Sequence, residues 1–222
     1  MRAAITAGYA IEIDLQISSD GVAMVFHDYD LDRLTHANGP VRARSAAELG
    51  ALTLRGADEG IPGLAEILTL VAGRVPLLIE LKYQQHSLGT ESLGRAVATD
   101  LGGYGGPVAV MSFHPAAVAE MGRLMPHIPR GLTTGTFDPD TYAPIPPEIC
   151  ARLRDIPDYT AVGASFISHD WSDLGHDRVT ALKQAGAKIL CWTVTSPEME
   201  QKARQVADNI TFEGYAAPFM EA

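Results

Sequence analysis

The chain has 222 residues, of which 46% are hydrophobic and 20% charged, with 27 acidic against 17 lysine and arginine side chains. This apolar fraction excludes an intrinsically disordered chain, because it can bury enough surface to offset the entropy of folding. The formal net charge of −10 argues against nucleic acid or an anionic membrane as the main partner, since both require a basic surface.

The two cysteines, Cys150 and Cys191, lie beside apolar residues, which predicts buried, reduced thiols rather than a disulfide framework. No apolar run approaches the roughly 18 residues of a membrane span. The first residues also lack the pattern of a secretory signal, so a cytoplasmic location is expected.

Short apolar runs alternate with amphipathic stretches along the whole chain. Strands are predicted at residues 10–16, 77–82, 108–112, 130–133, 163–168, 188–194 and 209–212. Helices are predicted between them, at residues 63–72, 90–101, 115–125, 148–154, 173–185 and 197–207. This alternation predicts a parallel sheet with crossover helices, hence an α/β fold, and a single domain covering residues 1–222.

One hairpin interrupts the alternation of strands and helices. The strand at residues 10–16 is followed by an Asp-Gly pair and a second apolar run that ends at His27. Asp-Gly suits a two-residue hairpin turn. If Asp20 and Gly21 are the two loop residues, Asp14 lies directly opposite His27.

Two carboxylates share one face of the first predicted strand. Because side chains alternate along a strand, Glu12 and Asp14 point together with Gln16, away from the isoleucines. A divalent cation could bridge the roughly 7 Å between side chains two residues apart. The alternative interpretation is the solvent-exposed face of an edge strand.

The next predicted strand is apolar until Glu80 and Lys82 appear at its end. Charged side chains at the carboxyl end of an apolar strand are typical of the active-site rim of a barrel. Glu80 could therefore be a third oxygen ligand, and Lys82 could hold a phosphate as a point charge. A structural Glu–Lys pair is the alternative.

His27 ends an apolar run next to acidic residues, which favours a catalytic imidazole. His114 follows the strand at residues 108–112 and could also reach the rim of the sheet. For the remaining histidines we expect solvated positions in loops or at helix starts; these are His36, His86, His127, His169 and His176.

Taken together, these segments resemble the glycerophosphodiester phosphodiesterases. The resemblance rests on the order and spacing of Ile-Glu-Ile-Asp-Leu at 11–15, Val-Phe-His-Asp at 25–28, Leu-Asp-Arg-Leu-Thr at 31–35, Ile-Glu-Leu-Lys at 79–82, Ser-Phe at 112–113 and Cys-Trp-Thr-Val at 191–194. It runs from about residue 2 to residue 219. It implies a TIM (β/α) barrel that hydrolyses a glycerophosphodiester to glycerol 3-phosphate and an alcohol.

The resemblance also implies roles for individual residues. The positions matching Glu12, Asp14 and Glu80 bind one Mg²⁺ or Ca²⁺ ion in the family, and His27 matches one of two catalytic histidines. The position of Lys82 lies in the site for the substrate phosphate. Trp192 matches an aromatic residue near the alcohol group, and Phe113 is a further candidate for substrate binding.

The sequence departs from the family pattern at its beginning. The family opens with a strand that ends in His-Arg-Gly and carries the second catalytic histidine, whereas here residues 2–9 resemble the last turns of the helix that follows it. We therefore expect a barrel that lacks its first strand. A start codon placed too late, a truncated chain with reduced activity, and a gap filled by another segment or a second chain all remain open.

Two other functions compete with the metal-dependent phosphodiesterase. One is a catalytically impaired binding or remnant protein of the same fold. The other is a metal-using sugar isomerase, which the scarcity of carboxylates at the later strand ends disfavours. The expected partner is a small phosphodiester substrate; an incomplete barrel would also favour self-association into a homo-oligomer.

Overall fold

The computed structural model of the chain describes residues 1–84, 89–143 and 145–219. These residues form two compact units, Met1–Pro129 and Arg130–Ala222, and each is described by itself.

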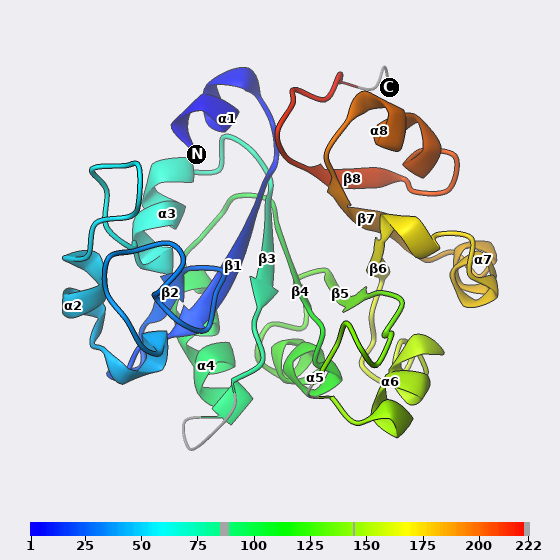
Figure 1. Cartoon of the computed structure of the whole chain (residues 1–222), viewed down its shortest axis with the longest axis horizontal. Helices are drawn as coiled ribbons and strands as arrows, with labels where there is room; N and C mark the ends of the chain where they lie inside the picture. The colour runs from blue at the N-terminus through cyan, green and yellow to red at the C-terminus, as the bar shows by residue number, and fades with distance from the viewer. Residues whose placement is uncertain (85–88, 144, 220–222) are drawn as a thin grey trace. The chain divides into compact units, whose positions relative to one another are not determined.

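The first unit is built on four strands in the order β2 (Ala23–Val25), β1 (Ile11–Ile17), β3 (Leu77–Leu81) and β4 (Val108–Ser112). β1, β3 and β4 are parallel neighbours, and β2 pairs antiparallel with β1. Figure 1 shows β1 and β3 running side by side in this unit. The predicted parallel sheet and hairpin are both confirmed.

The helices of the first unit cover the apolar face of these strands. Ile11, Ile13 and Leu15 are buried in one core cluster with apolar residues of α3 and α4, as the alternation along β1 predicted. The helical segments are α1 (Arg2–Ala7), η1 (Val41–Ala43), α2 (Ala46–Gly50), α3 (Leu64–Val71), α4 (Gly89–Leu101) and α5 (Pro115–Leu124). Sequence analysis missed α2, which is only five residues long and begins at a capping box between Ser45 and Glu48.

The register of the hairpin differs from the prediction by one residue. Leu15 pairs with Val25 and Ile17 with Ala23, and the amide of Phe26 donates to the carbonyl of Asp14 at 3.0 Å. Phe26, rather than His27, therefore lies opposite Asp14.

The cause is a three-residue loop in place of the predicted two-residue loop. The amide of Ser18 donates to the carbonyl of Val22, and the amide of Gly21 donates to the carbonyl of Ser18. Of the loop residues, Gly21 alone has a positive φ, of 84°. This is the pattern of a type I turn followed by a glycine bulge, whereas a type I′ turn would also need a positive φ at Asp20.

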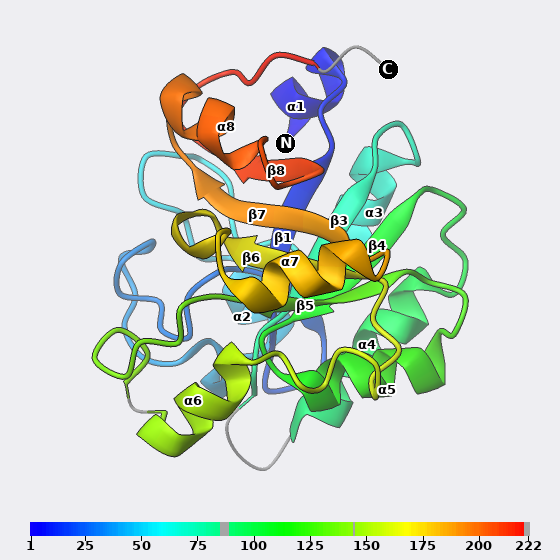
Figure 2. The same ribbon diagram turned by 90° about the vertical axis from the view of Figure 1, so that its right-hand side faces the viewer.

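The second unit contains four parallel strands in the order β5 (Arg130–Thr134), β6 (Phe166–Asp170), β7 (Lys188–Val194) and β8 (Asn209–Phe212). Its helical segments are α6 (Pro147–Arg154), η2 (Trp171–Asp173), α7 (Asp177–Gln184) and α8 (Pro197–Ala203). In Figure 2, α7 lies over the strands of this unit on the side that faces the viewer.

Two elements of the second unit begin three or four residues later than predicted, and α8 ends at Ala203 instead of residue 207. The strand expected at residues 163–168 is β6 at Phe166–Asp170, because Gly163 has a φ of 62° and closes a turn onto Thr160. The helix expected from Asp173 begins at Asp177, where the side chain of His176 accepts from the amide of Arg178. Both errors follow from local turn and capping geometry.

Cys150 and Cys191 are free and buried, which confirms the prediction. Among the residues that the structure describes, no helix is both long and apolar enough to cross a membrane.

Candidate active site

Three carboxylates come together in the first unit, two on β1 and one near the carboxyl end of β3. Asp14 lies opposite Glu80 in the parallel register, and Glu12 is two residues before Asp14 on the same face of β1. One oxygen from each of Glu12, Asp14 and Glu80 lies within 4.8 Å of the others. The predicted convergence of these three side chains is therefore present.

The ammonium group of Lys82 sits between two of these carboxylates. Its Nζ lies 2.7 Å from Oδ1 of Asp14 and 2.6 Å from Oε1 of Glu80, and the side chain is only 13% exposed. Burial alone would lower the pKa of Lys82, but the charges of Glu80 and Asp14 outweigh it and raise the pKa above its ordinary value. Lys82 is thus held as a cation.

Lys82 does not balance all three acids. Burial, together with the charges of Asp14 and Glu80, raises the pKa of Glu12 to about 8. Burial also raises the pKa of Glu80, although Lys82 offsets part of that effect. Carboxylate oxygens are the ligands that Mg²⁺ and Ca²⁺ prefer, so this donor set fits a hard divalent cation that would supply the missing positive charge.

His27 follows β2 and is held through its neighbour. Its Nδ1 lies 2.7 Å from Oδ1 of Asp28, and Asp28 accepts two bonds from Arg33, each of 2.7 Å. Arg33 holds the pKa of Asp28 below its usual range. The imidazole of His27 is 61% exposed, and it lies close enough to Glu80 to offset a small part of the rise in the pKa of that carboxyl.

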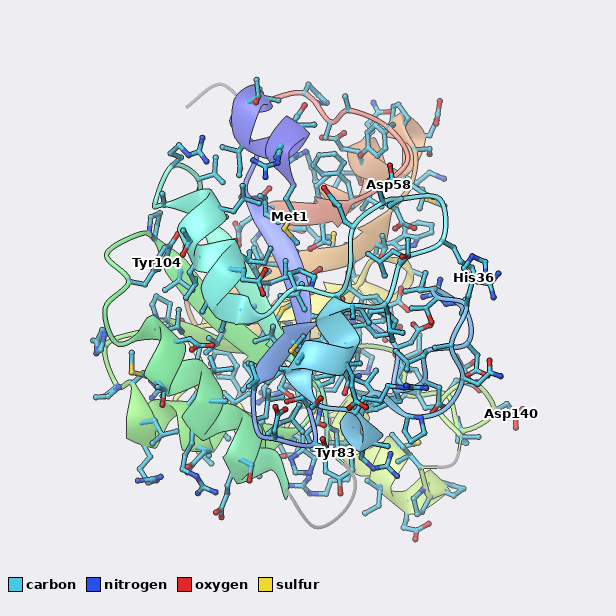
Figure 3. All side chains as sticks on the ribbon, turned by 90° about the vertical axis from the view of Figure 1, so that its left-hand side faces the viewer. Met1, His36, Asp58, Tyr83, Tyr104 and Asp140 are labelled. Carbon is cyan, nitrogen blue, oxygen red and sulfur yellow. The ribbon has the colours of Figure 1, made fainter. Side chains whose placement is uncertain are left out.

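The structure adds two tyrosines that sequence reasoning did not single out. Burial is the main cause of the raised pKa of Tyr29, with Lys82, Glu80 and Tyr83 close enough to contribute. Figure 3 shows Tyr83, the residue after Lys82, at the far end of the first unit from Met1. Tyr29 lies two residues after His27 and Tyr83 directly follows Lys82, and this closeness in sequence is the signal that could have identified them.

His114 and Phe113 lie just beyond the end of β4. The ring of His114 stacks on Tyr83 with centroids 4.4 Å apart, and burial lowers the pKa of His114. Tyr83 thus connects His114 to the segment that carries Lys82. Phe113 is half-buried at the same strand end.

Trp192 lies on β7 in the second unit, opposite Asp170 in the register. Its indole Nε1 donates to the carbonyl of Ser168 at 3.0 Å, which holds the ring against β6.

One histidine prediction is wrong. His169 is on β6 and only 1% exposed, with its Nδ1 2.8 Å from Oγ1 of Thr134 and its Nε2 3.5 Å from Oδ2 of Asp173. The apolar residues before it continue the strand through His169, so the imidazole is buried between Thr134 of β5 and Asp173 of η2 instead of solvated. His86 lies outside the described residues.

Comparisons with known proteins point to one family. The model of the glycerophosphoryl diester phosphodiesterase family matches residues 1–211. A glycerophosphodiester phosphodiesterase of Bacillus altitudinis is 30% identical over 149 residues, which are 60% of this chain and 58% of that protein. YhdW of Bacillus subtilis is 26% identical over 200 residues, 86% of this chain and 76% of its own length.

Solved structures show the fold. An Oleispira antarctica phosphodiesterase in complex with the product sn-glycerol-3-phosphate matches with a TM-score of 0.79 at 24% identity, covering 95% of this chain and 84% of that one. A Thermotoga maritima glycerophosphodiester phosphodiesterase matches with a TM-score of 0.71 at 21% identity, with the same coverage of 95% and 84%. The fold is the TIM (β/α) barrel type of these phosphodiesterases. The match to the Bacillus altitudinis relative, however, spans less than two thirds of that protein.

Proposed function

The chain belongs to the glycerophosphoryl diester phosphodiesterase family, a family of phosphoric diester hydrolases, and we propose that it hydrolyses a glycerophosphodiester to glycerol 3-phosphate and an alcohol. The observation that carries the proposal is the cluster of Glu12, Asp14 and Glu80 with Lys82 in contact with two of them. The product complex of the Oleispira antarctica relative supports a small phosphodiester as the substrate.

Glu12, Asp14 and Glu80 would hold one divalent cation, Mg²⁺ or Ca²⁺. When bound, the cation supplies positive charge to a non-bridging phosphate oxygen as negative charge builds there. The carboxylates fix its position, because two of them come from one strand and the third from the neighbouring strand in register.

Lys82 would contribute a second positive charge to the same phosphoryl group. Its ammonium group already lies among the carboxylates, so it can donate to a phosphate oxygen without crossing the site. Phe113 and Trp192 are the proposed contacts for the organic parts of the substrate.

His27 would transfer a proton at the attacking or the leaving oxygen. Its Nδ1 is engaged by Asp28, which leaves Nε2 to face the reacting group. Hydrolysis adds water across one P–O bond: the phosphorus gains a hydroxyl group and the alcohol oxygen gains a proton.

The proposal is tested by following glycerol 3-phosphate release from glycerophosphocholine with Mg²⁺, with Ca²⁺ and with excess chelator. We expect turnover that needs the cation and that falls by at least ~100-fold in Glu80→Gln, because that variant keeps the shape but removes a ligand charge. Glu91→Gln, which changes an exposed carboxylate on α4, is the matched control and keeps wild-type turnover.

Equal turnover of Glu80→Gln and the wild type would overturn the metal assignment. Cation binding without turnover of any glycerophosphodiester would instead support the non-catalytic binding protein.

A further inference from the structure

Two glutamines with buried side chains connect the segments that carry His27 and Lys82. Gln16 is near the end of β1 and 2% exposed, and Gln84 lies three residues beyond the end of β3 and is 6% exposed. The Nε2 of Gln84 donates to Oε1 of Gln16 at 3.0 Å. A buried amide is costly unless it is fully hydrogen-bonded, so the other bonds of this pair are informative.

The side-chain amide group of each glutamine also donates to backbone carbonyls beside the site. The Nε2 of Gln16 lies 3.3 Å from the carbonyl oxygen of His27 and 3.2 Å from that of Asp28. The Nε2 of Gln84 donates to the carbonyl oxygen of Lys82 at 2.8 Å. A continuous series of hydrogen bonds therefore runs from the backbone of His27 to the backbone of Lys82.

These carbonyls lie where the β-ladders have ended. β2 stops at Val25 and β3 stops at Leu81. β1 still binds the amide of Lys82, through the carbonyl of Leu15 at 3.1 Å, whereas the carbonyls of His27 and Lys82 are bound by the glutamine amides.

We propose that Gln16 and Gln84 are positioning residues that hold the backbones of His27 and Lys82 at a fixed separation around the carboxylates. The inference rests on the proposed function, since it assigns the two glutamines to the geometry of that reaction. Neither amide touches the reacting atoms; each acts through the residue whose carbonyl it binds. A shift of about 1 Å in such a group is enough to slow a reaction ~100-fold.

The kinetic test uses Gln16→Met, Gln84→Met and the double variant, which keep side-chain length and remove the amides. We expect Gln16→Met to lower kcat ~10-fold or more with little change in KM, because it releases the proton-transfer residue. Gln84→Met is expected mainly to raise KM, because it releases the lysine that contacts phosphate. The double variant loses less than the product of the two single losses, since both amides belong to one series of bonds.

The structural readout is hydrogen exchange of the peptide covering residues 26–33, measured by mass spectrometry. In the part of the chain that the structure describes, Gln84 has no hydrogen bond to that peptide and reaches it through Gln16. Gln84→Met is therefore expected to increase exchange there several-fold. Ser196→Ala, which removes the N-cap of α8 in the second unit, is the control for general destabilisation and leaves the peptide unchanged.

Wild-type kcat and KM in both single variants, or strictly multiplicative losses in the double variant, would overturn the inference. So would unchanged exchange at residues 26–33 in Gln84→Met. If the wild type itself shows no hydrolysis, the proposed function fails, whereas the exchange experiment still decides whether the glutamines couple the two segments.

Discussion

Lys82 is the residue on which the local charge of the site depends. Its contacts with Asp14 and Glu80 mean that removing the ammonium group leaves two half-buried or buried carboxylates facing each other. If the same group also contacts the substrate phosphate, its loss affects binding and the transition state together.

Lys82→Met is therefore expected to lower kcat/KM by ~100-fold or more. Lys82→Arg keeps the charge and should show only part of that loss in kcat/KM. Steady-state kinetics with glycerophosphocholine check this, with Lys202→Met on the exposed part of α8 as the control. An unchanged kcat/KM in Lys82→Met would remove the lysine from the proposed site.

The buried His169 is expected to make the free energy of unfolding depend on pH, independently of catalysis. Burial lowers the pKa of His169 from its ordinary value of 6.5, although Asp173 opposes that shift. Below pH 6.5 the unfolded chain therefore binds a proton that the folded chain resists, and the free energy of unfolding falls as the pH decreases.

Denaturant titrations between pH 7.5 and pH 5 measure this loss, whose slope for one proton reaches at most ~1.4 kcal/mol per pH unit. His169→Gln is expected to have a shallower slope than the wild type, while His36→Gln at an exposed position keeps the wild-type slope. Parallel curves for the wild type and His169→Gln would show that His169 does not carry this dependence.

At the scale of elements, the hairpin between β1 and β2 sets where His27 lies. Gly21 takes a positive φ of 84°, and a Cβ added there would meet no atom within 4 Å. Gly21→Ala is thus expected to cost ~1 kcal/mol of unfolding free energy through backbone strain alone.

Gly103 is a matched control, because a Cβ there also meets nothing within 4 Å and its φ is not in the positive region. Thermal unfolding of Gly21→Ala and Gly103→Ala compares the two. Equal stability of these variants would contradict the assignment of strain to the turn.

The same hairpin shows what sequence patterns could and could not predict. Apolar alternation placed Glu12 and Asp14 on one face, and the parallel neighbour of β1 brought Glu80 to them, because strand period and register are regular. The turn was identified from Asp20 and Gly21, but its length depends on side-chain bonds of Ser18 and Asp20 that the dipeptide alone does not specify.

Contacts between segments far apart in the chain were beyond sequence reasoning. The bond between Gln16 and Gln84 spans 68 positions, and neither residue has a distinctive local pattern. The burial of His169 likewise involves a contact with Thr134, which lies 35 positions away on the neighbouring strand.

At the scale of the whole molecule, binding of the cation should raise the free energy of unfolding. A ligand that binds only the folded state at 100 times its Kd adds about 2.7 kcal/mol. For a chain of this size that corresponds to a rise in Tm of about 5–10 °C.

Differential scanning calorimetry with Ca²⁺ or Mg²⁺ measures the rise. Glu80→Gln should lose most of it, whereas Glu91→Gln should keep it. An equal rise in Tm for Glu80→Gln would place the stabilising ion elsewhere.

The central claim is that Glu12, Asp14 and Glu80 bind one divalent cation between them. Anomalous diffraction from crystals soaked with Mn²⁺ tests it most directly, because the peak locates the ion without assuming its ligands. We expect a single strong peak about 2.0–2.6 Å from an oxygen of each of the three carboxylates. A peak bound by other residues, or none near these three at saturating Mn²⁺, would contradict it.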